Sequence, residues 1–318
     1  MAYIFGVDLG GTAMKLACFC EDGTIVHKWQ IPTCTQDNGS QILCRISDAL
    51  LDYLSQNNIP RTQVLGVGIG VPGPVLPDGT VNRCVNLGWD ILNVEKALSA
   101  QCGFRVKAGN DATLAALGES HMRGCDDLVL MTLGTGIGGG IVVNAKPLSG
   151  AGGAAGEFGH IVLEPNGCPC TCGNYGCAEQ YCSAPAIVRL AKQALTQSDA
   201  PSILRQMPEF DCKAVFDAAH DADALAQQVL EQVYDKLAQL IAAVCNTVDP
   251  ALFVIGGGVS QAGQMLLDGI GRYLGNYLFH ACRTQLALAS IGNDAGIYGC
   301  YQLVLQSIVI CQTKCNTF

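Results

Sequence analysis

The sequence predicts an α/β fold made of two related halves. Segments typical of strands and of helices alternate along the chain, which favours layers of helices packed on sheets. Residues 3–31 have the pattern of a strand, a glycine turn and further strands, and residues 126–148 again place two strands around a glycine turn. This repetition suggests a duplicated fold. With 318 residues, 49% of them apolar, the chain can fill roughly two domain cores.

The first half opens with short apolar strands. The run "YIFGVDLGG" ends in an aspartate and paired glycines, and "KLACFC", "EDGT" and "IVHKWQI" follow as strand, turn and strand. The segment "QILCRISDALLDYLSQ" has helical spacing at Ile42, Ile46, Leu50 and Leu54. The next apolar run, "VLGVGIGVPGPV", predicts a buried strand that stops at Pro72.

The second half contains the most strongly patterned helix, residues 222–245, whose apolar residues fall on one stripe. "ALFVIGGGV" then predicts a strand and a glycine turn, and "QMLLDGIGRYLGNYL" a further helix. We expect a domain boundary near Gly109, giving a smaller domain of residues 1–109 and a larger one of residues 110–296. The apolar segment of about 297–318 should dock back onto the first domain.

Composition excludes several classes of partner. The net charge is −9 and the isoelectric point about 4.9, which argues against general binding to nucleic acid or to anionic membranes. The start of the chain lacks the features of a signal peptide, and no apolar run approaches a membrane span. We therefore expect a cytoplasmic protein that binds small molecules, in which most of the 18 cysteines act as small apolar side chains.

Three glycine turns follow predicted strands, at residues 10–12, 134–140 and 256–258. Glycine leaves backbone N–H groups open to an oxyanion, although a single such turn is more often structural. The first turn is preceded by Asp8 and followed by Lys15, which favours a phosphate cradle with a carboxylate available for Mg²⁺.

The segment "GTGIGG" also matches a dinucleotide-binding fingerprint, so a nicotinamide-dependent dehydrogenase must be considered. That fingerprint should open a helix, whereas "IVVNAKPL" follows here and is typical of a strand. The P-loop pattern does not occur in the sequence either. A dehydrogenase is therefore disfavoured.

A cluster of cysteines in "CPCTCGNYGC" predicts a structural zinc site. His160, Cys170, Cys172 and Cys177 form a Cys₃His set suited to closed tetrahedral Zn²⁺. Cys168 in place of His160 is an alternative ligand, while a disulfide is disfavoured by a reducing compartment. A nucleic-acid zinc ribbon would bring a second CxxC pair and basic flanks, and neither is present.

Three carboxylates have both a structural and a functional interpretation. Glu157 and Glu179 flank the cysteine cluster, so a metal that fixes the loop would present both to vicinal hydroxyls; otherwise they are solvated surface acids. Asp111 stands where a strand ends and a helix begins. It is either a helix N-cap or a general base for an attacking hydroxyl.

Taken together, these motifs resemble the ROK family of sugar kinases, within the actin-like, ribonuclease-H-like ATPases. The resemblance covers essentially the whole chain and rests on seven motifs in order: "DLGGTAMK", "GVGIGVPGPV", "VNLGW", "GNDA", "LGTGIGGGIV", "GEFGHI" and "CTCGNYGCAEQYCS". It implies two domains with duplicated βββαβαβα cores and an interdomain cleft. Homodimers or homotetramers are common in the family and are expected here.

The resemblance also implies a role for each matching residue. Asp111 would be the catalytic base for the 6-hydroxyl of a hexose. The sugar would be held by Gly73, Asn86, Asn110, Asp111, Glu157, His160 and Glu179. Asp8 would lie near Mg²⁺, and ATP would be bound by Gly10, Gly11, Thr12, Lys15, Thr135, Gly136, Gly256 and Gly257. His160, Cys170, Cys172 and Cys177 match the structural zinc ligands of the family.

The resemblance therefore implies ATP-dependent phosphorylation of a hexose, and "CAEQYCSAPAIVRLA" favours glucose because it is similar to ROK glucokinases. N-acetylmannosamine, N-acetylglucosamine, allose and fructose are alternative substrates. A sugar-responsive transcriptional regulator is disfavoured because only seven residues precede Asp8, and a sugar-binding protein without catalysis because Asp8 and Asp111 are both present. The chain departs from the family at Gly109, where a glutamate is common, and in the additional Cys168 and Cys182.

Overall fold

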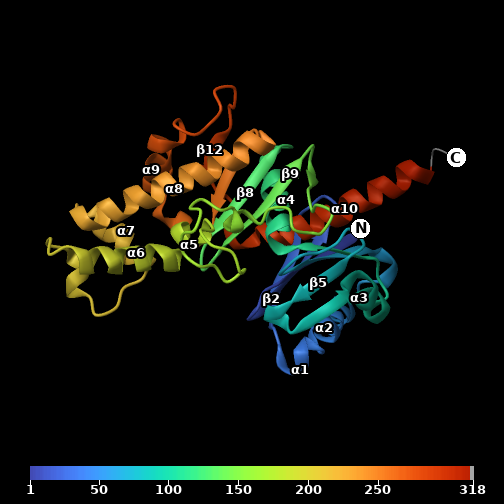
Figure 1. Ribbon diagram of the computed structural model, residues 1–318. Helices are drawn as coiled ribbons and strands as arrows, with labels where there is room; N and C mark the ends of the chain where they lie inside the picture. The colour runs from blue at the N-terminus through green and yellow to red at the C-terminus, as the bar shows by residue number, and fades with distance from the viewer. Residues whose placement is uncertain (316–318) are drawn as a thin grey trace. The chain divides into compact units, whose positions relative to one another are not determined.

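The computed structural model describes residues 1–315, and their side chains except at positions 83, 85 and 310–315. Two five-stranded sheets and a two-stranded hairpin form its framework, shown in Figure 1. The hairpin pairs β5 (Thr80–Cys84) with β6 (Trp89–Asn93) in antiparallel register. This hairpin was not predicted from the sequence.

The first sheet has the order β3-β2-β1-β4-β7. Its strands are β1 (Tyr3–Leu9), β2 (Ala13–Cys20), β3 (Ile25–Pro32), β4 (Val64–Val71) and β7 (Val106–Asn110). The first three strands are antiparallel, as the opening pattern predicted, whereas β4 and β7 continue the sheet parallel to β1. β4 ends directly before Pro72, because proline cannot donate to the ladder.

The second sheet has the order β10-β9-β8-β11-β12. Its strands are β8 (Leu128–Leu133), β9 (Ile137–Val143), β10 (Lys146–Pro147), β11 (Leu252–Gly256) and β12 (Gln285–Leu288). Counted along the chain, both sheets place their third, second, first, fourth and fifth strands side by side. The shared order confirms the predicted duplication. It also confirms that β9, and not a helix, follows the "GTGIGG" turn.

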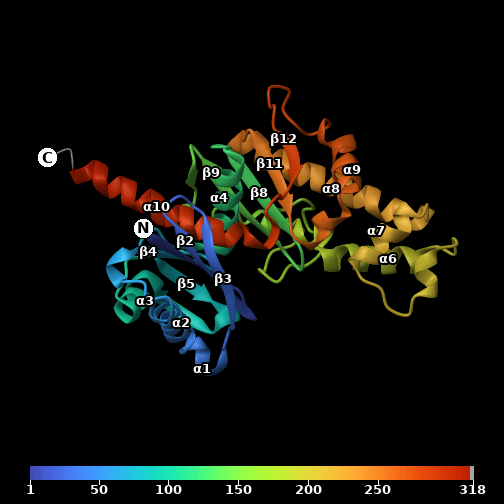
Figure 2. The same ribbon diagram turned by 180° about the vertical axis from the view of Figure 1, so that it is seen from behind.

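Helices cover both faces of the first sheet (Figures 1 and 2). On one face, α2 (Ile42–Gln56) and α3 (Val94–Cys102) form a core with Phe5, Val7 and other buried residues. On the other face, α10 (Ala295–Cys315) packs against Ile4 and Phe19. The side chains of successive residues of β1 therefore pack into cores on opposite faces of the sheet, as the two-residue period of a strand requires. The short α1 (Gln36–Gly39) precedes α2.

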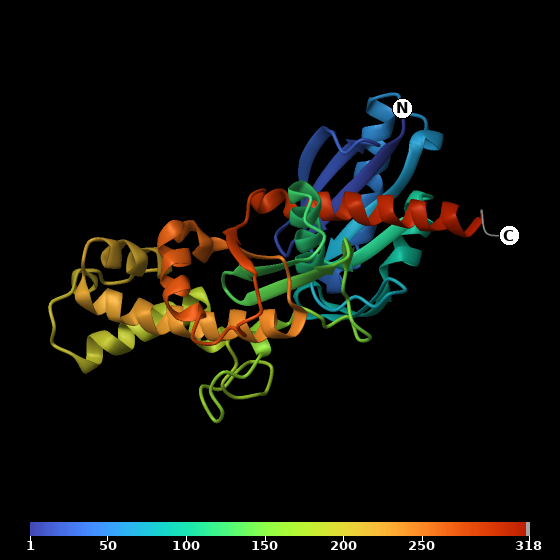
Figure 3. The ribbon, with the colours of Figure 1, turned by 90° about the horizontal axis from the view of Figure 1, so that it is seen from above.

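The helix α4 (Asp111–Arg123) lies directly against α10, as Figure 3 shows from above. The two helix backbones lie in contact at Gly118 and Gly299, which have no Cβ. A Cβ at Gly118 would meet the backbone of Ala295, and one at Gly299 would meet the carbonyl oxygen of Leu114. Within the described residues, 1–127, 140–156 and 293–315 pack into one compact unit, and residues 128–139 and 157–292 into a second. α4 therefore groups with the first unit. The domain division between residues 109 and 110 stays a prediction. Residues 316–318 of the segment predicted to dock back onto the first domain lie outside the described residues.

The second unit carries a group of helices, which are labelled in Figure 1. They are α5 (Glu179–Cys182), α6 (Ala184–Gln197), α7 (Cys212–His220), α8 (Ala224–Val248) and α9 (Gln264–Leu274). Short 3₁₀ turns connect elements of both units: Arg61–Gln63, Val85–Leu87, Phe158–His160, Ile203–Gln206, Gly258–Ala262 and Gly292–Asp294. Within residues 1–315, none of the helices combines the length and apolar character of a membrane span.

Candidate active site

The junction of β7 and α4 places Asn110 and Asp111 side by side. The Oδ1 of Asn110 accepts from the amide of Thr113 at 3.0 Å, which makes Asn110 the N-cap of α4. Its Nδ2 donates to the carbonyl oxygen of Gly73 at 3.0 Å and to Oδ1 of Asp111 at 3.1 Å. The amide of Ala112 also donates to this Oδ1 at 2.8 Å. The capping role left open for Asp111 thus belongs to Asn110, and the carboxylate of Asp111 is oriented by donors at the positive end of a helix.

The other candidate sugar residue of the first unit, Asn86, lies on the β5–β6 hairpin. It belongs to the 3₁₀ turn Val85–Leu87 and is exposed. The indole of Trp89 anchors this hairpin by donating to the carbonyl oxygen of Gly39 at 3.2 Å. An exposed amide on a fixed hairpin is suited to hydrogen bonding with a hydroxylated ligand.

The first glycine turn connects β1 and β2, and it includes Gly10, Gly11 and Thr12. Gly11 and Thr12 are exposed, so their backbone groups are accessible to a ligand. Beside the turn, Nζ of Lys15 lies 3.5 Å from Oδ2 of Asp8 and donates to the carbonyl oxygen of Asn293 at 2.9 Å. Burial raises the pKa of Asp8, and Lys15 opposes this shift. A bound divalent cation would favour the ionised carboxylate.

In the second unit, the turn between β8 and β9 is supported by Glu179. Oε2 of Glu179 accepts from the amide of Ile137 at 2.9 Å, and a Cβ at Gly136 would lie 2.5 Å from this oxygen. Thr135, at the tip of the turn, is exposed. Glu179 is therefore more than a surface acid, because it fixes the turn that carries Thr135 and Gly136. Sequence spacing gave no signal of this bond.

The third glycine turn follows β11. Gly257 has a φ of 84°, and a Cβ there would collide with the backbone of Leu133 at the end of β8. Glycine is required at this position both by the backbone conformation and by the close approach. Gly256 is buried at the end of the strand, whereas Gly257 and Gly258 are exposed.

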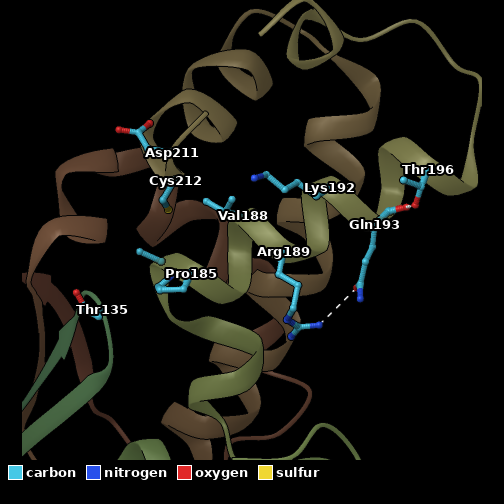
Figure 4. Close-up of a pocket in the computed structure, with 10 residues that line it drawn as sticks. Thr135, Pro185, Val188, Arg189, Lys192, Gln193, Thr196, Asp211 and Cys212 are labelled. Atoms are coloured by element: carbon cyan, nitrogen blue, oxygen red, sulfur yellow. Dashed lines mark hydrogen bonds between the residues drawn. The ribbon is translucent and has the colours of Figure 1, made fainter. Parts of the chain in front are cut away.

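A hollow of about 660 Å³ opens beside Thr135 in the second unit, shown in Figure 4. It is lined by Thr135, Ala184, Pro185, Val188, Arg189, Lys192, Gln193, Thr196, Asp211 and Cys212. Most of these residues come from one side of α6, and Asp211 and Cys212 from the start of α7. Its walls are therefore partly apolar, with Arg189, Lys192 and Asp211 as charged groups. A hollow of this size can hold a nucleoside-sized ligand.

The four predicted zinc ligands are brought together. The ligand atoms of His160, Cys170, Cys172 and Cys177 all lie within 4.8 Å of one another. Nδ1 of His160 lies 3.7 Å from the sulfur of Cys170, and the sulfurs of Cys172 and Cys177 are also 3.7 Å apart. In a tetrahedron with Zn–S bonds of about 2.3 Å, neighbouring sulfurs are about 3.8 Å apart. The set therefore fits Zn²⁺.

The pKa values of two thiols in this cluster are shifted in opposite directions, and burial raises the pKa of Cys177 to about 12. The backbone amide of Cys172 and the adjacent thiols lower the pKa of Cys170 to about 7, which favours a thiolate near neutral pH. Cys168 is not part of the four-residue group, and its amide instead donates to the hydroxyl of Tyr181 at 2.9 Å. The geometry thus favours His160 over Cys168 as the fourth ligand.

His160 has a second function available to it because its two ring nitrogens face different groups. Nδ1 faces the cysteine cluster, and Nε2 lies 4.0 Å from Oε2 of Glu157. A metal on Nδ1 would leave the proton on Nε2, which could then donate to a carboxylate or a ligand hydroxyl. The metal-binding and sugar-binding roles expected for His160 are therefore compatible.

The fold and these motifs define an ATPase of the actin-like, ribonuclease-H-like type. The model of the ROK family matches residues 4–307, and the chain belongs to that family. It is 39% identical over 311 residues to a glucokinase of Halalkalibacterium halodurans, covering 95% of this chain and 94% of the relative. An N-acetylmannosamine kinase of Escherichia coli is 32% identical over 300 residues, covering 92% and 95% of the two chains.

Among solved structures, the chain is similar to a ROK family glucokinase from Streptomyces griseus in complex with glucose and AMPPNP. The identity is 32%, the TM-score is 0.72, and the match covers 96% of this chain and 100% of the other.

Proposed function

We propose that this protein is a glucokinase, which transfers the γ-phosphoryl group of ATP to the 6-hydroxyl of glucose. The observation that carries the proposal is the Asn110–Asp111 pair, a carboxylate oriented at the start of α4 by its neighbour. The similarity to a glucokinase at 39% identity, and to a glucokinase structure that contains glucose and AMPPNP, supports glucose and ATP as the substrates.

In this proposal the sugar is bound by hydrogen bonds from polar side chains and the backbone. Asn86, Asn110, Glu157, His160 and Glu179 hold the hydroxyls, with the backbone of Gly73 beside them. A carboxylate accepts from two vicinal hydroxyls, and an amide both donates and accepts, so this set discriminates the arrangement of hydroxyls on the ring. Asn110 would bind the sugar while it continues to orient Asp111.

Asp111 takes the proton of the 6-hydroxyl as its oxygen attacks the γ-phosphorus. The new O–P bond forms while the bond between the γ-phosphorus and the β–γ bridging oxygen breaks, and ADP leaves. A hydroxyl is a weak nucleophile at neutral pH, so one well-placed proton acceptor and exact positioning supply most of the catalysis. The bond from the amide of Ala112 keeps one carboxylate oxygen in a fixed direction.

The nucleotide is proposed to bind at the three glycine turns. Gly10, Gly11, Thr12, Lys15, Thr135 and Gly136 contact the phosphates, and Gly256 and Gly257 the nucleoside. The hollow beside Thr135 has the size and partly apolar wall that a nucleoside requires. Asp8 would hold Mg²⁺, which neutralises charge on the phosphates when bound.

Zn²⁺ is proposed to be structural. His160, Cys170, Cys172 and Cys177 use all four tetrahedral positions, so no position remains for a substrate. The metal would fix the loop between Glu157 and Glu179 and thereby the two carboxylates at its ends. Assembly as a homodimer or homotetramer and a cytoplasmic location stay predictions, which light scattering and cell fractionation test.

The test is a coupled assay of ADP release over a panel of sugars: glucose, mannose, fructose, allose, N-acetylglucosamine and N-acetylmannosamine. We expect the highest kcat/KM for glucose. A higher value for another sugar would reassign the substrate but keep the kinase. Glucose binding without ADP release from any sugar would contradict the kinase and favour a sugar-responsive regulator.

A further inference from the structure

The side chain of Glu95 bridges two backbone elements of the first unit. It lies on the first turn of α3, and its Oε1 accepts from the amide of Ala108 at 3.1 Å. Its Oε2 accepts from Nζ of Lys107 at 2.8 Å. The side chain of Glu95 is 15% exposed, whereas that of Lys107 is 29% exposed.

The amide of Ala108 belongs to the terminal strand of the first sheet. β7 pairs with β4 on one side, and it is the last strand in the sheet order. A strand in this position presents amides that no neighbouring strand accepts. Glu95 supplies an acceptor for one of them, two residues before Asn110.

Glu95 is also fixed to the β5–β6 hairpin. The amide of Val94 donates to the carbonyl oxygen of Gly79 at 3.0 Å, in the turn before β5. Gly79 has a φ of 80°, and a Cβ there would collide with the side chain of Glu95. In addition, the side chain of Asn93 donates to Oγ1 of Thr80 at 2.9 Å and accepts from the amide of Lys96. These contacts hold the base of the hairpin and the start of α3 together.

We propose that Glu95 is a positioning residue for the sugar site, which fastens the end of β7 to the β5–β6 hairpin. The hairpin carries Asn86, and β7 leads into Asn110 and Asp111. Glu95 thus sets the spacing between the two asparagines and the direction of the Asp111 carboxylate. The inference rests on the proposed function for these three residues.

Of the two interactions of Glu95, the hydrogen bond to the amide of Ala108 is the one proposed to restrain β7. An ion pair between partly exposed side chains contributes little, since solvent screens it. A bond to a strand amide, in contrast, restrains the backbone directly and leaves an unsatisfied donor when it is removed. The substitution Glu95→Gln keeps an acceptor for Ala108 and loses the charge, whereas Glu95→Ala loses both. Lys107→Met loses only the ion pair.

The experiment compares these three variants with the wild type in two measurements. Hydrogen exchange of the amides of residues 106–110 should become at least about tenfold faster in Glu95→Ala and stay near the wild-type rate in the other two. In steady-state kinetics, Glu95→Ala should raise the KM for glucose and lower kcat, with kcat/KM for glucose reduced about tenfold and the KM for ATP unchanged. Glu95→Gln should retain most of the wild-type kcat and should have a KM for glucose close to that of the wild type.

Wild-type exchange at residues 106–110 in Glu95→Ala would overturn the proposal. So would faster exchange with unchanged kcat/KM, or a Glu95→Gln variant as impaired as Glu95→Ala. A fall in thermal stability accompanied by a higher KM for ATP would show general damage to the fold instead of positioning. If the wild type phosphorylates no sugar, the proposed function fails, while the exchange measurement still reports separately whether Glu95 restrains β7.

Discussion

Asn110 donates a hydrogen bond to Oδ1 of Asp111, its neighbour in sequence, at 3.1 Å. Because Asn110 also caps α4 through Thr113 and reaches the carbonyl oxygen of Gly73, it is held at three points. The two residues therefore have different roles at the start of α4. Asn110 fixes the structure, and Asp111 contributes a carboxylate whose direction is set by its neighbours.

We expect Asp111→Asn to lower kcat for glucose phosphorylation by about 10² to 10⁴, the usual contribution of a general base. The amide is similar in size and can still accept from the amide of Ala112, but it cannot take a proton. The affinity for glucose should stay within the same order of magnitude. A coupled kinetic assay gives kcat, and calorimetric titration gives the Kd.

Asp52→Asn is a matched control, because Asp52 is exposed on α2 in the same unit and the substitution removes the same charge. It should have wild-type kinetics. Retention of more than about a tenth of kcat in Asp111→Asn would exclude Asp111 as the general base.

The zinc proposal predicts that Cys172→Ser loses the metal and weakens sugar binding together. Cys172 is exposed, so the change removes a ligand with little loss of packing. We expect bound zinc to fall from about one per chain to near zero and the KM for glucose to rise about tenfold. Metal content is measured by plasma emission spectroscopy and the KM by the coupled assay.

Cys168→Ser tests the choice between the two possible ligand sets. Cys168 is outside the group of four ligand atoms, so this variant should keep its zinc and its KM. Zinc loss in Cys168→Ser would restore the alternative in which Cys168 replaces His160. A metal-free Cys172→Ser enzyme with an unchanged KM would contradict the coupling between the metal and the sugar site.

The sequence predicted the features that depend on local spacing. The glycine turns after β1, β8 and β11 and the cysteine cluster could be recognised because their residues are close together in the chain. It could not decide whether Asp111 is the N-cap of α4 or a general base, because a shift of one residue in the helix start changes which residue is the cap. The ligand choice between His160 and Cys168 was open because either residue could complete a set of four ligands with Cys170, Cys172 and Cys177, and the loop conformation decides between them.

The features that depend on contacts distant in sequence were not predicted. The bond from the amide of Ile137 to Glu179 joins residues 42 positions apart, and no periodic pattern reports such a contact. The hollow beside Thr135 forms only when the start of α7 lies near α6. The β5–β6 hairpin was missed as well, because each of its strands has only five residues and Asp90 and Ile91 are both exposed.

Asp8 should contribute to catalysis while destabilising the fold at neutral pH. Its pKa is raised above the ordinary 3.8 by burial, so the folded state holds the proton more tightly than the unfolded state does. The associated stability is complete below the unfolded pKa and is lost as pH rises through the folded pKa. Asp8→Asn removes the buried charge, and we expect its Tm at pH 7 to rise by about 2 °C.

The same variant should lose most of its activity with Mg-ATP, because the cation loses its carboxylate. Calorimetric scans from pH 3 to pH 7 check the sign, since the gain in Tm over the wild type should be absent at the acid end and grow as pH rises. A Tm advantage that is largest at low pH would contradict this account, and so would full activity.

Filling the hollow beside Thr135 should weaken nucleotide binding selectively. Val188 is half-buried in its wall, and Val188→Trp would place an indole in the space proposed for the nucleoside. We expect the KM for ATP to rise about tenfold or more, while the KM for glucose changes little, because an overfilled site excludes its ligand sterically. Gln197→Trp adds the same indole at the exposed end of α6, outside the hollow, and should leave both constants unchanged. Equal KM values for ATP in the two variants would place the nucleoside elsewhere, whereas a parallel rise in both constants for Val188→Trp would indicate that α6 had been displaced.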